Sequence, residues 1–236
     1  MNPEGSRIGI IFNGAPLFTG DAGSGESEIR KWIIENDWLE CIVQLPERMF
    51  FNTGITTYFW IVTNKKSQVR QGKVQLINAS TIGKSIKKNL GDKSVEIDLE
   101  RSNELFETYE EFKENEYCKI LPNNFFGYTK ICIEQPIFEN GTPIKDKKGN
   151  FKPDPKKRDF EKVPLTKDLD EYIKKEVEPY LSNFWLDRSK DKVGYEINFT
   201  QYFYKYLELR DPEIILEEIS EIDKDISNIT NEFRIN

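Results

Sequence analysis

The sequence lacks histidine altogether, and its 236 residues include three cysteines and no apolar run long enough to span a bilayer. Without histidine, Ser-His-Asp and Cys-His nucleophile activation are excluded, and the commonest transition-metal ligand is missing. The cysteines, Cys41, Cys118 and Cys132, are far apart and form no C-x-x-C pair, so neither a disulfide framework nor a zinc site is indicated. The first residues do not form a basic and then apolar leader, so we expect a cytoplasmic location and no membrane partner.

The overall composition is that of an ordinary globular chain. Hydrophobic residues make up 37% and aromatic residues 13%, enough for one sizeable core or two modest domains. The formal net charge of -7 argues against a free-standing, non-specific DNA-binding protein, because phosphate contacts need concentrated lysine and arginine. Lysines and arginines do occur at 65–93 and 142–167. One interpretation is that they approach phosphates, and the alternative is that they are only solvated, as scattered lysines in polar loops usually are.

The N-terminal part of the chain has the pattern of an α/β fold. Residues 7–13 form a short apolar run, which predicts a buried parallel strand that ends in the glycine-rich loop 14–25. Ile29, Trp32 and Ile33 then fall on one face of a predicted helix.

Three further strands are predicted after this helix. Residues 41–46 and 58–62 are rich in β-branched and aromatic side chains, and 73–78 alternates in the manner of an edge strand. The order β-α-β-β predicts the closing half of an α/β sheet.

The remainder of the chain is more polar. A helix is predicted near 99–115, where Leu105, Tyr109 and Phe112 form an apolar stripe, and 128–135 alternates like a strand. Glycine, proline and lysine dominate 139–164, which indicates an exposed loop or linker. Beyond that loop the chain is expected to be mainly helical.

The last helix has unusually regular apolar positions. Asp211 and Pro212 form a good N-cap and first-turn pair for a helix that runs nearly to the C-terminus. Its apolar residues step alternately by four and three, as in the a/d seam of a coiled coil, and acidic residues flank them. Such a seam needs a partner, which is either another chain or a face within this same chain. The seam residues are Ile215, Ile219, Ile222, Ile226, Ile229 and Phe233.

The glycine-rich segment from Gly20 to Ser27 has the glycine spacing of a P-loop. Glu26 stands where the phosphate-binding lysine is required, and a carboxylate there would repel a phosphate, so nucleotide hydrolysis is not indicated. The segment is either a flexible loop that caps the next helix or a surface loop that becomes ordered around a ligand.

A second loop, Leu45–Ile55, places two adjacent aromatic residues and an amide between strands, where α/β enzymes carry functional loops. An enzyme that modifies a base holds it outside the duplex against aromatic faces and amide hydrogen bonds, which Phe50, Phe51 and Asn52 can supply. The alternative is that one phenylalanine fills the core and that Asn52-Thr53-Gly54 is a plain turn.

Four stretches of the sequence resemble one family. The segment GSRIGIIFNGAPLFTGDAGSGESEIRKWIIENDWLECIVQLPERMFFNTGITTYFWIVTNKK is similar to the methyltransferase (modification) subunit of type I restriction-modification systems, an N6-adenine DNA methyltransferase. GKVQLINAS, FGYTKICIEQPI and VGYEINFTQYFYKY resemble segments that follow in the same family. The resemblance covers most of the chain and is weaker at about 80–115 and 139–165. It identifies the chain as the C-terminal portion of such a subunit.

The resemblance implies a fold and a division into domains. The fold is α/β, the C-terminal half of a Rossmann-like, S-adenosylmethionine-dependent methyltransferase sheet followed by a mainly helical C-terminal domain. We therefore expect 1–95 to close the catalytic domain, 96–165 to form a connecting α+β segment with an exposed loop, and 166–236 to form a helical assembly domain.

The resemblance also implies an activity and partners. Members of the family transfer a methyl group from S-adenosylmethionine to the exocyclic nitrogen of adenine in DNA. They do so in a complex with a second modification subunit, a restriction subunit and a specificity subunit. The specificity subunit selects the DNA sequence.

Two motifs of the family are absent from this chain, and both are expected upstream of Met1. These are the acidic-proline-Cys-Gly-rich cofactor turn and the Asn-Pro-Pro-aromatic motif that holds the adenine amine. The chain alone is therefore expected to be inactive and not to bind S-adenosylmethionine tightly. The alternative is a non-catalytic interaction module that docks on the specificity subunit.

Several positions match the family's functional segments, none of them catalytic or metal-binding. The adenine- and DNA-binding loop, with one phenylalanine as the stacking partner, comprises Phe50, Phe51, Asn52, Thr53 and Gly54. The loop expected to contact DNA or a partner includes Asn13, Gly20, Asp21, Gly23, Ser24 and Gly25. The terminal seam from Ile215 to Phe233 matches the region that docks on the specificity subunit.

Overall fold

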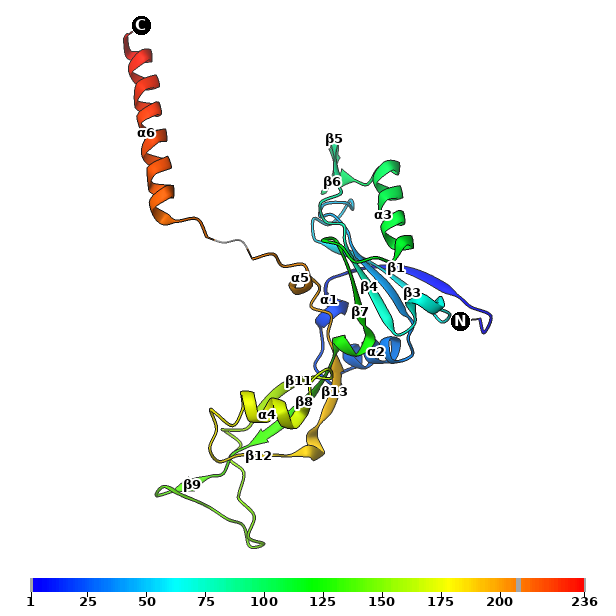
Figure 1. Ribbon diagram of the computed structural model, residues 1–236, viewed down its shortest axis with the longest axis vertical. Coiled ribbons are helices and arrows are strands. Elements are labelled where there is room, and N and C mark those ends of the chain that lie inside the picture. Colours follow the sequence, from blue (N-terminus) through cyan, green and yellow to red (C-terminus); the bar gives the residue numbers. More distant parts are fainter. Residues whose placement is uncertain (1, 207–208, 236) are drawn as a thin grey trace. The chain divides into compact units, whose positions relative to one another are not determined.

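A computed structural model describes residues 2–206 and 209–235 (Figure 1). The contacts divide the chain into two compact units, Met1–Phe203 and Tyr204–Asn236. Residues 166–203, which the sequence assigns to the assembly domain, thus belong by their contacts to the first unit. The second unit contains α6 (Pro212–Ile235), and this confirms the long C-terminal helix predicted from the Asp-Pro pair and the apolar spacing.

The main sheet of the first unit has five strands in the order β1-β3-β2-β4-β7. β3 runs antiparallel to both of its neighbours, β2 and β4 are parallel, and β7 is antiparallel to β4. β1, β2 and β4 therefore point in one direction, and their carboxyl ends lie at the same edge of the sheet. The strands are β1 (Arg7–Asn13), β2 (Leu39–Gln44), β3 (Thr57–Thr63), β4 (Lys73–Asn78) and β7 (Cys118–Pro122).

Two of the predicted strands occupy different places in the sheet from those expected. β1 pairs antiparallel with β3 and lies at the margin of the sheet, with Ile8 and Ile11 exposed, so the prediction of a buried parallel strand is wrong. β4 is an interior strand rather than an edge strand. Its polar alternate residue, Gln75, is buried because its amide donates hydrogen bonds to the Thr108 carbonyl oxygen and the Cys118 sulfur.

Alternation along the central strands directs side chains into a separate core on each face of the sheet. On one face, Ile42 and Trp60 pack under α1 (Ala15–Phe18), α2 (Gly25–Glu35) and α5 (Phe199–Tyr202). The other face packs under α3 (Leu99–Glu111), with residues Cys41, Val43, Leu45, Ile77, Ala79, Tyr109 and Cys118. All three cysteines of the sequence are free and buried, and burial raises the pKa of each thiol.

The two helices that flank the sheet begin at side-chain caps. Ser24 accepts a hydrogen bond from the Ser27 backbone N–H at the start of α2, and Asp98 accepts one from Arg101 at the start of α3. The buried stripe of α3 includes Tyr109, as the spacing predicts.

The buried face of α2 differs from the predicted one. Of the predicted residues, Ile29 and Trp32 are exposed and only Ile33 is half-buried against the core; the buried residues are Ser27, Arg30 and Ile34. An arginine can occupy the buried face because backbone carbonyl oxygens accept hydrogen bonds from its guanidinium group.

A second sheet is built around β8 (Gly127–Glu134). β11 (Asp159–Pro164) pairs with one side of β8, and β12 (Trp185–Leu186) and β13 (Lys192–Tyr195) pair with the other. α4 (Leu169–Glu176) packs on this sheet through Ile173. The prediction of a loop at 139–164 is thus wrong at β11, and the prediction of a mainly helical chain beyond it is wrong at β12 and β13. Their few apolar residues give little local strand signal, and pairing with β8 decides their conformation.

Short elements complete the first unit. β9 (Phe138–Glu139) and β10 (Thr142–Pro143) form one hairpin, and β5 (Lys84–Leu90) and β6 (Lys93–Glu96) form another. The elements η1 (Gln68–Arg70), η2 (Asn123–Phe126) and η3 (Arg188–Lys190) are single-turn 3-10 helices. Across the described residues, every helix is too short or too polar to cross a membrane.

Candidate functional site

The carboxyl ends of β1, β2 and β4 are the natural place for a ligand in a sheet of this kind. The loop that follows β2 and the segment that follows β4 meet there around an open cavity of about 450 Å³. The cavity is lined by Gln44, Pro46, Glu47, Arg48, Thr56, Ser80, Gly83 and Val95. Sequence analysis had selected the loop but not the wall formed by Gly83 and Val95, which comes from a more distant part of the chain.

The two adjacent phenylalanines of the β2–β3 loop have different surroundings. Phe50 is half-buried and packs against the core beneath α3. The Phe51 side chain is 57% exposed, and the Lys93 ammonium lies 5.3 Å from its ring centroid. The alternative reading, in which one phenylalanine fills the core, therefore describes Phe50, while Phe51 presents an aromatic ring to solvent.

The backbone of the loop is held at several points, including a hydrogen bond from the Asp92 N–H to the Phe51 carbonyl oxygen. The Thr56 hydroxyl donates to a Glu47 carboxylate oxygen over 3.1 Å, and Phe50 and Thr53 form an isolated β-bridge. Asn52 and Gly54 are exposed, and within the described residues the Asn52 amide forms no hydrogen bond. The predicted binding residues thus lie together on one loop, with Phe51 and Asn52 free to contact a ligand.

The glycine-rich loop is anchored at several points along its length. Gly20 and Gly23 adopt φ values of +86° and +85°, which favour glycine, and a Cβ on Gly20 would lie 2.3 Å from the Ser24 hydroxyl oxygen. Asp21 forms an ion pair with Lys130 of β8, and the hydrogen bond from Lys130 lowers the pKa of the Asp21 carboxyl.

The glycine-rich loop also keeps an accessible side. Asp21, Gly23 and Gly25 are exposed, and no atom lies within 4 Å of the Cβ position of Gly25. Asn13, the last residue of β1, accepts a hydrogen bond from the Ala15 N–H and so starts α1. The structure thus places these predicted residues on one connected stretch, whose first residue, Asn13, pairs with Thr57 at the end of the β2–β3 loop.

Arg30 is a residue of this region that sequence analysis missed. Its side chain is buried with 3% exposure, and its guanidinium donates to the carbonyl oxygens of Tyr195 (2.7 Å), Thr19 (2.7 Å), Pro16 (3.1 Å) and Gly20 (3.3 Å). Burial lowers its pKa. Arg30 therefore ties the glycine-rich loop to β13, and the signal for it was an arginine within the apolar part of α2.

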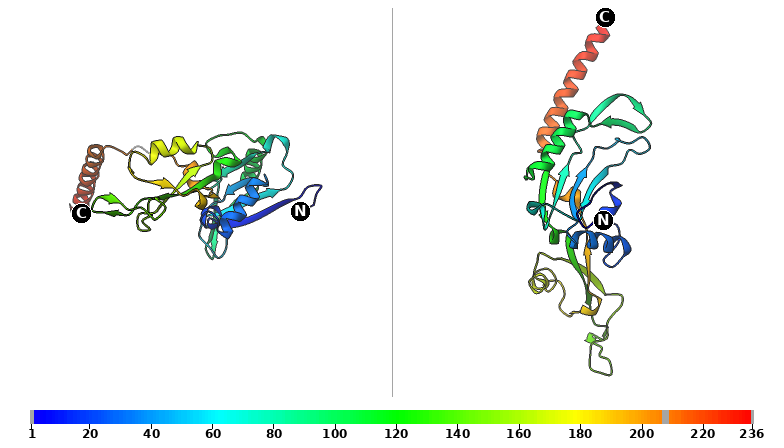
Figure 2. Two further views of the ribbon diagram at one scale, coloured as in Figure 1. Left: turned by 90° about the horizontal axis from the view of Figure 1, so that it is seen from below. Right: turned by 90° about the vertical axis from the view of Figure 1, so that its right-hand side faces the viewer.

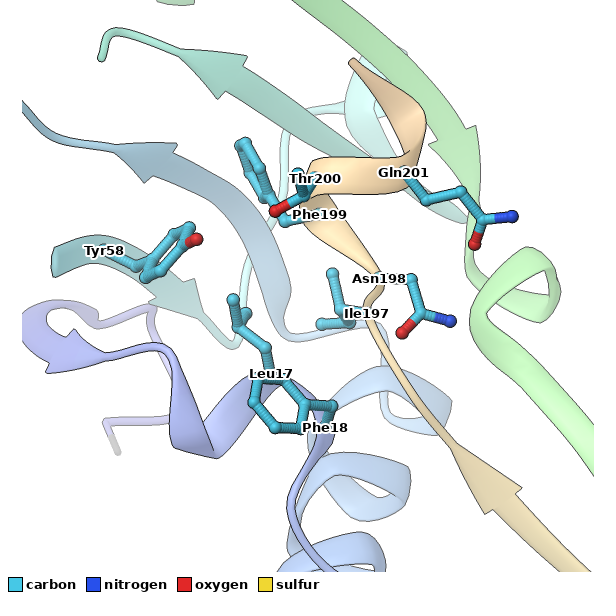
Figure 3. Close-up of a pocket in the computed structure, with 8 residues that line it drawn as sticks. All are labelled: Leu17, Phe18, Tyr58, Ile197, Asn198, Phe199, Thr200 and Gln201. Carbon is cyan, nitrogen blue, oxygen red and sulfur yellow. The ribbon is translucent and has the colours of Figure 1, made fainter. Parts of the chain in front are cut away.

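A smaller pocket of about 300 Å³ opens near the start of β3 (Figure 3). Leu17 and Phe18 of α1 and Tyr58 of β3 meet the segment 197–201 there. The ring centroids of Tyr58 and Phe199 are 5.3 Å apart, and burial raises the pKa of the Tyr58 hydroxyl. Sequence analysis missed this pocket because its walls come from opposite ends of the first unit.

The described residues contain no group of three or more cysteine, aspartate or glutamate side chains that could hold a metal ion. The polar residues that line the cavity at the carboxyl edge are Gln44, Glu47, Arg48, Thr56 and Ser80, and the loop adds the Phe51 ring and the Asn52 amide.

Comparisons with known proteins point to one family. Residues 1–132 match the family model described as N-6 DNA Methylase. The chain is 31% identical over 139 residues to the type I restriction enzyme MjaIX methylase subunit of Methanocaldococcus jannaschii, covering 59% of this chain and 23% of that protein. It is 36% identical over 83 residues to the HindI methylase subunit of Haemophilus influenzae, covering 35% of this chain and 18% of that protein. The chain thus matches less than a quarter of the length of these relatives.

Two solved structures align with the chain at low similarity. The type I restriction-modification methyltransferase subunit from Streptococcus thermophilus aligns with a TM-score of 0.42 and 22% identity, covering 50% of this chain and 23% of that one. The modification subunit of a type I restriction enzyme from Vibrio vulnificus aligns with a TM-score of 0.40 and 13% identity, covering 71% and 28%.

Proposed function

Because this chain belongs to the N-6 DNA methylase family, we propose that it is the part of a type I adenine-N6 DNA methyltransferase subunit that contacts the extruded adenine and docks on other subunits. The observation that carries the proposal is the position and exposure of the β2–β3 loop. It lies inside the matched residues and at the carboxyl edge of the sheet, and it presents Phe51 and Asn52 to solvent.

Phe51 is the proposed stacking partner of the adenine. A base taken out of the duplex loses its stacking neighbours, and an exposed aromatic ring replaces them. Phe50 is half-buried in the core and anchors the loop. Asn52 is placed to form a hydrogen bond with the base or its backbone.

The proposed methyl donor is S-adenosylmethionine, but the described residues do not fit it. The glycine-rich loop is the segment of this chain nearest in type to a cofactor turn, and its Asp21 carboxylate is engaged by Lys130. The backbone of that loop is fastened by Arg30. We propose that the chain does not methylate DNA by itself.

The proposed macromolecular partners are DNA, a specificity subunit, a second modification subunit and a restriction subunit. We propose α6 as the docking element, because its isoleucines from Ile215 to Ile229 form a regular a/d seam that needs a partner. The side chain of Phe233 lies outside the described residues. We propose that the assembly region begins at the division after Phe203 rather than at residue 166.

Replacing Phe51 by alanine is expected to slow methyl transfer by the assembled enzyme that contains this chain. Base–aromatic stacking contributes about 1–3 kcal/mol, so the rate should fall by about 5- to 150-fold. The assay measures transfer from tritiated S-adenosylmethionine to unmethylated DNA. Phe51→Trp should retain most of the activity, and Phe106→Ala is the matched control, because Phe106 is 60% exposed on α3. Full activity of Phe51→Ala would refute the proposed role.

Titration of S-adenosylmethionine into this chain alone is expected to give no binding heat. The physical reason is that the glycine-rich loop has its Asp21 carboxylate paired with Lys130 and its backbone bonded to Arg30. Isothermal calorimetry measures this directly, and the assembled enzyme serves as the positive control. Micromolar binding by the chain alone would contradict the proposal that it depends on other parts of the enzyme.

A further inference from the structure

The β5–β6 hairpin differs in charge from the rest of the chain. Residues 84–96 contain four lysines, one aspartate and one glutamate, whereas the whole chain has a net charge of -7. Nearly all of β5 is exposed, and this two-stranded ribbon is a sheet of its own. Figure 2 shows the hairpin projecting beyond the main sheet.

The hairpin is bonded to the loop that carries Phe51. The Phe51 carbonyl oxygen accepts a hydrogen bond from the Asp92 N–H (3.0 Å), and the Arg48 carbonyl oxygen accepts one from the Ser94 N–H (2.9 Å). A Cβ on Gly91, whose φ is +62°, would lie 2.7 Å from the Phe51 oxygen, so glycine permits this close approach. The hairpin and the loop therefore form one structural unit.

The lysines of the hairpin differ in their partners. Lys84 lies 3.4 Å from an Asp98 carboxylate oxygen, and Lys93 lies over the Phe51 ring. Lys87 and Lys88 are exposed and form no ion pair with any described residue. They lie in the irregular stretch between the pairs Ser85–Val95 and Leu90–Lys93, where β5 has extra residues. Two uncompensated positive charges thus project beside the candidate base-binding loop.

We infer that the β5–β6 hairpin is an arm that contacts the phosphate backbone of duplex DNA through Lys87 and Lys88. The inference rests on the proposed function and adds to it the surface that positions the duplex next to Phe51. A two-stranded ribbon fits the major groove, and lysine contacts to phosphate orient a duplex without reading its sequence. Exposed lysines on a short ribbon can instead serve only to prevent edge-to-edge aggregation, and the experiment separates these roles.

The test compares the full chain with the Lys87→Gln/Lys88→Gln double variant in binding a fluorescein-labelled, random-sequence duplex of about two helical turns. Fluorescence anisotropy is recorded over a range of salt concentrations. Each lost phosphate contact reduces the slope of log K against log salt by about 0.9, so the double variant should lose about 1.8. The control is Lys174→Gln/Lys175→Gln, an exposed pair of adjacent lysines on α4 outside the two lysine-rich stretches of the sequence, which should keep the slope.

Three results would overturn the inference: an unchanged slope in the double variant, an equal loss in the control, or no binding by the full chain at low salt. Both altered sites are exposed, and circular dichroism checks that both variants are folded. The Phe51 assay distinguishes the two proposals. Loss of methyl transfer in Phe51→Ala together with an unchanged slope refutes the arm alone, and the opposite pattern refutes the proposed role of Phe51 alone.

Discussion

Replacing Glu40 by leucine is expected to lower the free energy of unfolding by about 3–5 kcal/mol, because it leaves a buried arginine without its counterion. Glu40 is 1% exposed, and its carboxylate accepts two hydrogen bonds from Arg7, at 3.0 and 3.1 Å. Arg70 lies 3.7 Å from it and is itself buried, with its guanidinium 4.2 Å from the ring centroid of Tyr109. Urea unfolding followed by circular dichroism measures the change.

Two further variants test this reading of the Glu40 cluster. Arg7→Gln should cost about 1.5–3 kcal/mol, less than Glu40→Leu, because the buried Glu40 carboxylate loses two hydrogen bonds from Arg7 but keeps Arg70 as a counterion. Glu40→Leu/Arg70→Met should recover part of the lost stability, because it removes both buried charges. If Glu40→Leu alone were as stable as the unaltered chain, the buried ion pair would have no role in stability.

Replacing Arg30 by methionine is expected to cost about 2–4 kcal/mol and to loosen the glycine-rich loop. The four carbonyl oxygens that accept hydrogen bonds from Arg30 would lose a charged donor, and each such bond contributes about 1.5–3 kcal/mol. Relief from burying the guanidinium offsets part of that cost. Hydrogen exchange should therefore become faster in residues 14–25, while chemical denaturation reports the loss of stability.

The matched control for Arg30 is its neighbour on α2. Lys31→Met removes a positive charge of the same helix and should change stability by at most about 0.5 kcal/mol, because Lys31 forms no hydrogen bond or ion pair with a described residue. In Arg30→Lys, the lysine ammonium can reach one or two of the four oxygens. The stability of this variant should therefore lie between those of Arg30→Met and Lys31→Met. Unchanged exchange in the loop of Arg30→Met would show that the loop is held by its glycine turns and by Asp21 instead.

The elements with strong local signals were predicted correctly. β2 and β3 are rich in β-branched and aromatic residues, and α3 and α6 have helical spacing behind good caps. β1 shows the limit of such signals, because an apolar run predicts a strand but not its direction or its neighbour. β11 and β13 show the opposite limit, because their own residues give little strand signal. Both become strands because they pair with β8.

The candidate site was likewise predicted only in part from local sequence. The loop with Phe50 and Phe51 was recognised from its residue types and position between strands. Which ring is exposed depended on packing beneath α3, and two adjacent phenylalanines cannot reveal that by themselves. The β5–β6 hairpin was not predicted. The hydrogen bonds that attach it to the loop join residues more than forty positions apart, and a local sequence pattern does not indicate such contacts.

The sequence by itself determined the family, through the dense resemblance across the first sixty or so residues and the match over 1–132, and it determined the helices whose caps and apolar spacing are local. The tertiary structure alone decided the order and direction of the strands, the burial of Arg30 and Glu40, and the exposure of Phe51. The physical reason is that burial and strand pairing depend on partners supplied from distant parts of the chain. A local sequence pattern indicates which conformations and contacts a residue favours. The packing of the whole chain decides which residues it contacts.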